Sequence, residues 1–140
     1  MKIPCKIIYN TDDSVWYVEA PDIYEGILTY GNSLEEAKEM AQDALSGLIA
    51  TYMEGGKEIQ VPSKREGPNW YDIELSPNVS FAVWLRSMRK KSGMTLIEAA
   101  DRLGVKYQVY QKLENPETAN PTLKTIAKIK KVFNIDTIEV

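Results

Sequence analysis

The 140-residue chain is long enough for one domain or two small ones. It has no histidine and one cysteine, which excludes Ser-His-Asp and Cys-His catalysis, most zinc sites and an internal disulfide. Residues 1–79 hold 6 Lys and Arg against 14 Asp and Glu (net −8), whereas residues 80–140 hold 11 against 6 (net +5). This change of sign favours two surfaces with different partners over two domains whose charge only keeps them soluble. The basic half would suit phosphate groups, and the acidic half would attract a basic protein.

The chain begins with three short apolar segments that are predicted to be strands. The first covers residues 2–9 (KIPCKIIY), where Pro4 confines the strand to an edge or to its own start, and Cys5 is a small buried side chain. The second covers residues 15–20 (VWYVEA), and the short link NTDDS indicates an antiparallel hairpin. After a turn at PDIYEG, residues 27–30 form the third strand.

A long helix is predicted next. Ser33 and Glu36 have the spacing of a capping box at its start, and Gly55-Gly56 ends it. Apolar residues recur at helical spacing, which predicts one buried stripe. The members of this stripe are Leu34, Ala37, Ala41, Ala44, Leu45, Leu48 and Ile49.

The first half ends with a loop and a fourth strand. Residues 57–68 are polar and interrupted by Pro and Gly, so they are predicted to be a loop. Residues 70–75 alternate between apolar and polar, as in a strand with one solvated face. The order β-β-β-α-β predicts an α+β domain over residues 1–75, with the helix packed on one face of the sheet. Residues 76–78 (SPN) are predicted to be a hinge.

The second half contains a helix, a glycine turn and a second short helix. Thr95 and Glu98 form a predicted capping box, and Gly104 has the position of a C-cap. A short helix then covers about residues 106–113, with Tyr110 and Leu113 buried. This order is typical of a helix-turn-helix, which exposes the start of its second helix to a DNA major groove, although an ordinary helical hairpin shares the turn.

The flanking residues strengthen the DNA-binding interpretation. Residues 80–135 resemble an Xre/Cro-type helix-turn-helix domain in three stretches: RKKSGMTLIEAADRLGV, QKLEN and NPTLKTIAKIKKVFNI. The resemblance implies an all-α domain over residues 80–140. It also implies a buried ion pair between Arg89 in the first helix and Glu114 at the end of the third.

The helical phase predicts which side chains face DNA. With Tyr110 and Leu113 buried, the exposed Gln and Lys side chains point outward, where Gln can bind adenine and Lys can bind guanine. The resemblance places Tyr107, Gln108 and Lys112 at the usual base-reading positions. The predicted DNA-binding residues are Thr95, Lys106, Tyr107, Gln108, Gln111 and Lys112. The chain departs from the pattern at Leu96, at Tyr110 and in the loop of residues 116–120, which has no basic residue.

The first half is similar to HicB-type antitoxins. The resemblance lies in Pro21-Asp22, Gly26, the Thr29-Tyr30-Gly31 segment and SLEEA at residues 33–37, taken in that order, although PDIYEG is one residue longer than the usual turn. It implies a truncated RNase H-like fold and a partner, a HicA-type ribonuclease toxin that this half neutralises. The toxin-binding surface within residues 1–75 is not identified by the sequence.

A metal-dependent nuclease is the rival for the first half. Such chemistry needs clustered carboxylates, but the first strand has none and turn chemistry explains Asp22. We therefore expect no catalytic residue, no metal and no cofactor. The sequence predicts a cytoplasmic, non-enzymatic antitoxin and autorepressor, a homodimer or higher even oligomer on operator DNA, without a membrane span. The alternative is a stand-alone transcriptional regulator whose first half senses a ligand or dimerises.

Overall fold

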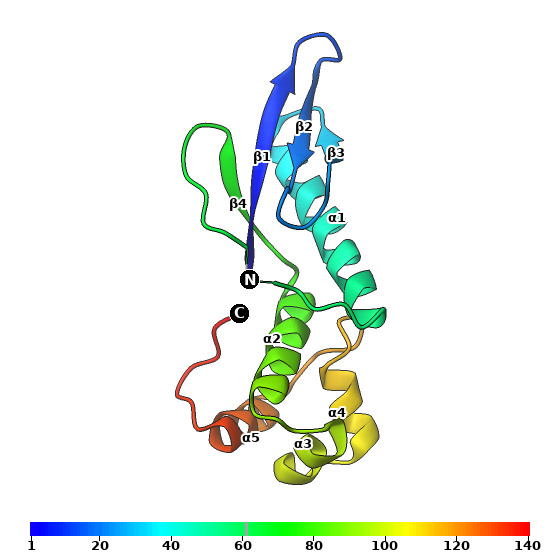
Figure 1. The fold of residues 1–140 in the computed structure, drawn as a ribbon, viewed down its shortest axis with the longest axis vertical. Helices are drawn as coiled ribbons and strands as arrows, with labels where there is room; N and C mark the ends of the chain where they lie inside the picture. Colours follow the sequence, from blue (N-terminus) through cyan, green and yellow to red (C-terminus); the bar gives the residue numbers. More distant parts are fainter. Residues whose placement is uncertain (61) are drawn as a thin grey trace. The chain divides into compact units, whose positions relative to one another are not determined.

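The computed structural model describes residues 1–60 and 62–140. Val61, which belongs to the predicted loop, lies outside the described residues. The chain divides into two compact units, Met1–Ser76 and Pro77–Val140. The first is an α+β unit and the second contains only helices, as predicted (Figure 1). Every helix in the described part of the chain is too short or too polar to cross a lipid bilayer.

The first unit contains a four-stranded antiparallel sheet in the order β3-β2-β1-β4. Its strands are β1 (Lys2–Asn10), β2 (Val15–Glu19), β3 (Ile27–Gly31) and β4 (Trp70–Glu74). Strand β1 is central, but its pairing with β2 covers only Lys6–Asn10. Pro4 therefore lies near the start of β1, where the strand has a neighbour on the β4 side alone, and its missing N–H costs the sheet little.

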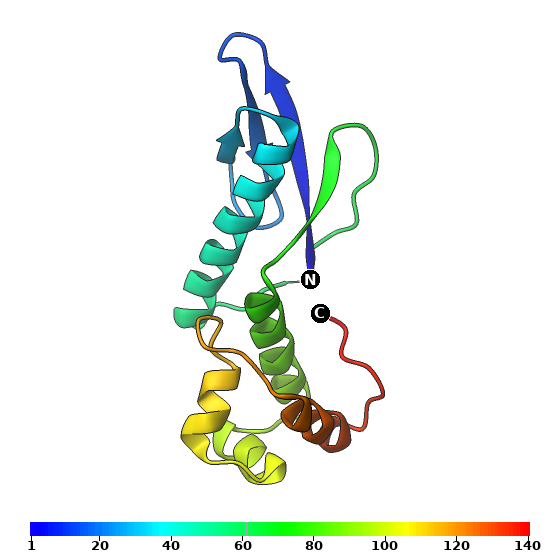
Figure 2. The same cartoon turned by 180° about the vertical axis from the view of Figure 1, so that it is seen from behind.

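Helix α1 (Leu34–Glu54) covers one face of this sheet, as Figures 1 and 2 show from opposite sides. The centre of the face beneath it is fully buried at Ile3, Cys5, Ile7 and Val18, and Ile7 and Val18 lie opposite each other on β1 and β2. The helix contributes Ala37, Ala41, Leu45, Ser46, Ile49 and Met53 to the buried side. Ser46 and Met53 were not predicted, whereas Leu34, Ala44 and Leu48 from the predicted stripe are only half-buried.

The start of α1 differs in one detail from the predicted capping box. The Glu36 amide donates to the Ser33 hydroxyl over 3.0 Å, as expected, but the Glu36 carboxylate accepts from the Asn32 amide over 3.2 Å. Gly31 lies against the same turn: a Cβ at Gly31 would come within 2.4 Å of the Ala37 backbone nitrogen. Only glycine therefore lets β3 run this close to α1.

The second unit contains α2 (Pro77–Lys91), α3 (Leu96–Leu103), α4 (Tyr107–Leu113) and α5 (Leu123–Phe133). The predicted hinge is partly wrong, because Pro77 and Asn78 already belong to α2; proline is well suited to the first turn of a helix, where its missing N–H would have no partner. The core of this unit is built from Leu85, Ala99, Leu103, Tyr110, Leu113 and Ile129, all buried.

Candidate functional site

Helices α3 and α4 form the predicted helix-turn-helix. Thr95 caps α3 by accepting from the Glu98 amide over 3.1 Å, and the Glu98 carboxylate accepts in return from the Thr95 amide over 3.4 Å. Gly104 ends α3 in the left-handed conformation with φ of 69°. Ala100 on α3 is buried. These local features fix the direction in which α4 leaves the turn.

One face of α4 is open to solvent. All six residues predicted to bind DNA are exposed, and Lys106 is the N-cap residue of α4. Gln111 donates through Nε2 to the Tyr107 hydroxyl over 3.0 Å, so these two side chains are ordered as a pair. Thr95 differs from the others because its hydroxyl already caps α3.

Val109 is a further exposed residue of α4 that the sequence pattern does not single out. Its side chain is 47% exposed on α4, between Gln108 and the buried Tyr110. A valine at a solvated position of a short helix offers the apolar contact that a thymine methyl group accepts in the major groove. The helical phase that placed Gln108 outward also places Val109 near the surface, so the signal was present in the sequence.

The Arg89 guanidinium forms an ion pair with the Glu114 carboxylate. Nε donates to Oε2 over 2.7 Å and Nη2 donates to Oε1 over 3.1 Å, with both side chains largely buried. The third arm, Nη1, donates to the Met94 carbonyl over 3.0 Å. The hydrogen bond to Glu114 is the main cause of a raised pKa at Arg89. The pair ties α2 to the end of α4 and so holds the exposed face of α4 in place.

Tyr110 fills the core beside this ion pair. Its side chain is fully buried, and burial is the main cause of its raised pKa. Its hydroxyl lies near Glu114 and Arg89. Among the described residues, however, none is placed to form a hydrogen bond with this hydroxyl. The aromatic ring thus occupies the place that a branched aliphatic side chain would fill in the expected pattern.

In the first unit, Asp22 is part of an ion pair. Arg65 donates to the Asp22 carboxylate over 3.0 Å, and its guanidinium stacks 4.9 Å from the centre of the Trp70 ring. Residues 22 and 65 are far apart in sequence, so this contact was not predicted. Within residues 1–60 and 62–140 no three His, Cys, Asp or Glu side chains gather as a metal site would require.

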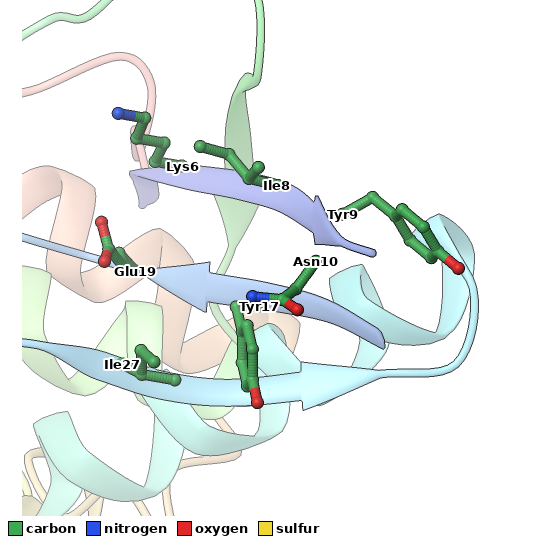
Figure 3. Close-up of a pocket in the computed structure, with 7 residues that line it drawn as sticks. All are labelled: Lys6, Ile8, Tyr9, Asn10, Tyr17, Glu19 and Ile27. Atoms are coloured by element: carbon green, nitrogen blue, oxygen red, sulfur yellow. The ribbon is translucent and has the colours of Figure 1, made fainter. Parts of the chain in front are cut away.

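The sheet face away from α1 carries a shallow pocket of about 170 Å³. Figure 3 shows that side chains of β1, β2 and β3 line it. Ile8 and Ile27 are 42% and 52% exposed there, and Tyr30, on the same face of β3, is 55% exposed. The pocket is lined by Lys6, Ile8, Tyr9, Asn10, Tyr17, Glu19 and Ile27.

Both halves match known protein families. Residues 2–80 match the family described as "HicB_like antitoxin of bacterial toxin-antitoxin system", and residues 85–140 match the family described as "Helix-turn-helix". Two relatives come from Photorhabdus laumondii subsp. laumondii. Antitoxin HicB 1 is 38% identical over 69% of this chain and 60% of its own length, and Antitoxin HicB 2 is 34% identical over 81% and 77%.

The fold and the comparisons agree on the class of protein. An α+β unit followed by a helix-turn-helix with an exposed second helix is the arrangement of a helix-turn-helix protein with an additional domain. The match over residues 2–80 then places it more narrowly. The chain belongs to the HicB-like antitoxin family and carries a C-terminal helix-turn-helix domain. This chain spans about 60% of the length of the first of these relatives.

Proposed function

We propose that the chain neutralises a HicA-type ribonuclease toxin through its first unit and represses its own operon through its second. The observation that carries the first part is the family match over residues 2–80, supported by the net charge of −8 in this half, which suits a basic partner. The observation that carries the second part is the exposed face of α4 on a basic unit.

The first unit acts in this proposal as a binding module and not as a nuclease. Asp22 is engaged by Arg65, and β1 carries no carboxylate. Purified protein incubated with RNA and Mg²⁺ or Mn²⁺ is expected to leave the RNA intact. Cleavage that disappears on replacing Asp22 or Glu19 would contradict this.

Repression requires enough DNA surface for a stable complex. The loop of residues 116–120 offers no basic side chain to the DNA backbone, so we expect modest affinity for one copy. A homodimer or higher even oligomer would read two half-sites one helical turn apart. The predicted ligand of the second unit is operator double-stranded DNA in the cytoplasm. The unit would contact this DNA through α4 and the start of α3.

Co-expression tests both parts at once. The small protein encoded beside this gene should arrest growth alone, and the full chain should relieve the arrest and co-purify with that protein. The chain should also shift DNA from upstream of its own gene and leave a random duplex of equal length unshifted. DNA binding without relief of arrest would favour the alternative, a stand-alone regulator whose first half senses a ligand or dimerises.

A further inference from the structure

The face of the sheet away from α1 has the properties of a protein interface. Three large side chains on this face are between 42% and 55% exposed: Ile8 on β1, and Ile27 and Tyr30 on β3. Tyr17 lies between them, with Ile8 opposite it on β1 and Tyr30 opposite it on β3. We define Ile8, Tyr17, Ile27 and Tyr30 as the open-face patch. Exposed apolar side chains that gather on one face mark a candidate interaction site.

The two aromatic rings of the patch are ordered before any partner arrives. The Tyr17 hydroxyl donates to the Asp13 carboxylate over 2.6 Å, and this bond is the main cause of a raised pKa at Tyr17. The Tyr17 and Tyr30 rings meet edge to face, with 6.5 Å between their centres. Rings fixed in this way lose little conformational entropy on binding, which is what interface anchors require.

Charge identifies the kind of partner. The turns at the two ends of β2 carry exposed carboxylates at Asp12, Asp13 and Glu25 and contain no lysine or arginine, and Asp13 contacts Tyr17 of the patch. On the patch itself, Lys6 stands opposite Glu19, so these two charges offset each other. A second copy of this half would bring another net charge of −8 against the first and be repelled. A protein with Lys and Arg around an apolar centre would be attracted.

We propose that the open-face patch is the surface on which the toxin docks, with apolar toxin residues over Tyr17 and Ile27 and basic residues beside the acidic turns. This inference rests on the proposed function, because it takes the partner to be the toxin. It assigns the toxin contact to the sheet face and leaves α1, on the other face, outside it.

The matched pair of variants is Ile27→Lys and Met40→Lys in the full chain. Ile27 and Met40 are 52% and 41% exposed, and both changes add the same charge to the same unit, but Met40 lies on α1. The partner probe is the purified product of the neighbouring toxin gene, titrated by calorimetry. Ile27→Lys should weaken binding by roughly thirtyfold or more, as loss of an interface anchor does, whereas Met40→Lys should change it by less than about threefold.

Two further variants keep the test decisive. Tyr17→Phe retains the ring and removes its bond to Asp13, so it should weaken binding by roughly two- to tenfold through lost ordering. Tyr30→Lys replaces Ile27→Lys if the latter lowers the melting temperature. Raising the salt concentration should weaken binding of the wild-type chain, because the surfaces attract each other through opposite charge.

The outcomes separate the inference from the function it rests on. If the wild-type chain does not bind the toxin, the proposed function fails. If it binds and the folded patch variants bind equally well, or Met40→Lys weakens binding as much as Ile27→Lys, the docking surface is wrong while the function stands. If Ile27→Lys lowers the mass of the isolated chain in light scattering, the patch joins two copies and the inference is overturned.

Discussion

At the scale of single residues, the contacts of Arg89 are the most consequential in the second unit. Its three guanidinium nitrogens donate to Glu114 twice and to the Met94 carbonyl once. Residue 89 lies in α2, residue 94 lies just before α3 and residue 114 ends α4, so one side chain connects the helices that frame the turn. Arginine suits this position because its planar fork matches a carboxylate through two parallel bonds.

Replacing Arg89 by alanine should therefore destabilise the second unit. A buried charge left without its partner costs about 3–5 kcal/mol, and Glu114 would be left in that state. We expect a clear fall in the melting temperature of this unit, measured by calorimetry on the full chain. The double variant Arg89→Met, Glu114→Leu should recover much of the loss, because it removes both charges. An unchanged melting temperature in Arg89→Ala would show that the pair contributes nothing to stability.

Cys5 gives a prediction about reactivity. Its side chain is fully buried beneath α1, and burial raises the pKa of the thiol to about 12. Since the thiolate is the reactive form, the native protein should react with a thiol reagent such as DTNB only as fast as it unfolds. The protein in denaturant should release one equivalent of the chromophore at once. Rapid labelling of the native protein would contradict the buried position of this strand.

At the scale of elements, α1 contains a glycine that its structure does not need. Gly47 lies in the middle of the helix, and a Cβ there would have no atom within 4 Å. Gly47→Ala should stabilise the first unit by about 0.5–1 kcal/mol, because glycine in a helix costs about that much relative to alanine. Chemical denaturation of the full chain measures this. A decrease in stability would mean that the exposed position is covered in the native protein.

The two predicted base-reading residues of α4 should behave differently. Gln108→Ala should weaken operator binding by about 1–3 kcal/mol and leave binding to random DNA nearly unchanged, because an amide reads a base edge. Lys112→Ala should do the same if it contacts guanine. If it contacts phosphate, it should weaken both duplexes equally and flatten the salt dependence. Titrations of both duplexes at several salt concentrations distinguish these results.

The control for both changes is toxin neutralisation. Gln108 and Lys112 lie in the basic unit, so neither change should release the toxin while the protein stays folded. An unchanged operator affinity in Gln108→Ala would overturn the assignment of Gln108 as a base-reading residue. Release of the toxin by either change would show that the two activities share a surface.

The elements that were predictable from the sequence have local causes. The Thr95 capping box and the Gly104 turn depend on residues within one helical turn, and the structure contains both. The cap at Ser33 is also local, but the Glu36 carboxylate accepts from the Asn32 amide and not from the Ser33 amide. The spacing of the residues alone does not distinguish these two partners. The Arg65–Asp22 pair and the open-face patch depend on which strands become neighbours, and no pattern within a single segment specifies that.

At the scale of the whole molecule, two compact units of opposite charge support a division of labour. A fragment of residues 1–78 contains all of the sheet and α1. We expect it to fold, to suppress toxin-induced growth arrest and to lose operator binding, because α4 is absent. Circular dichroism and co-expression measure these properties. A folded fragment that fails to neutralise the toxin would show that the second unit takes part in toxin binding.

The close approach at Gly31 also limits which sequences can encode this protein. A side chain there would overlap the backbone of Ala37, and backbone cannot move aside as a flexible side chain can. In a library with residues 31 and 47 both randomised, selection for toxin neutralisation should return glycine alone at the first position. At the second it should return a broad mixture rich in helix formers such as alanine. The two glycines look alike in the sequence, but only Gly31 is expected to be required at its position in any functional variant.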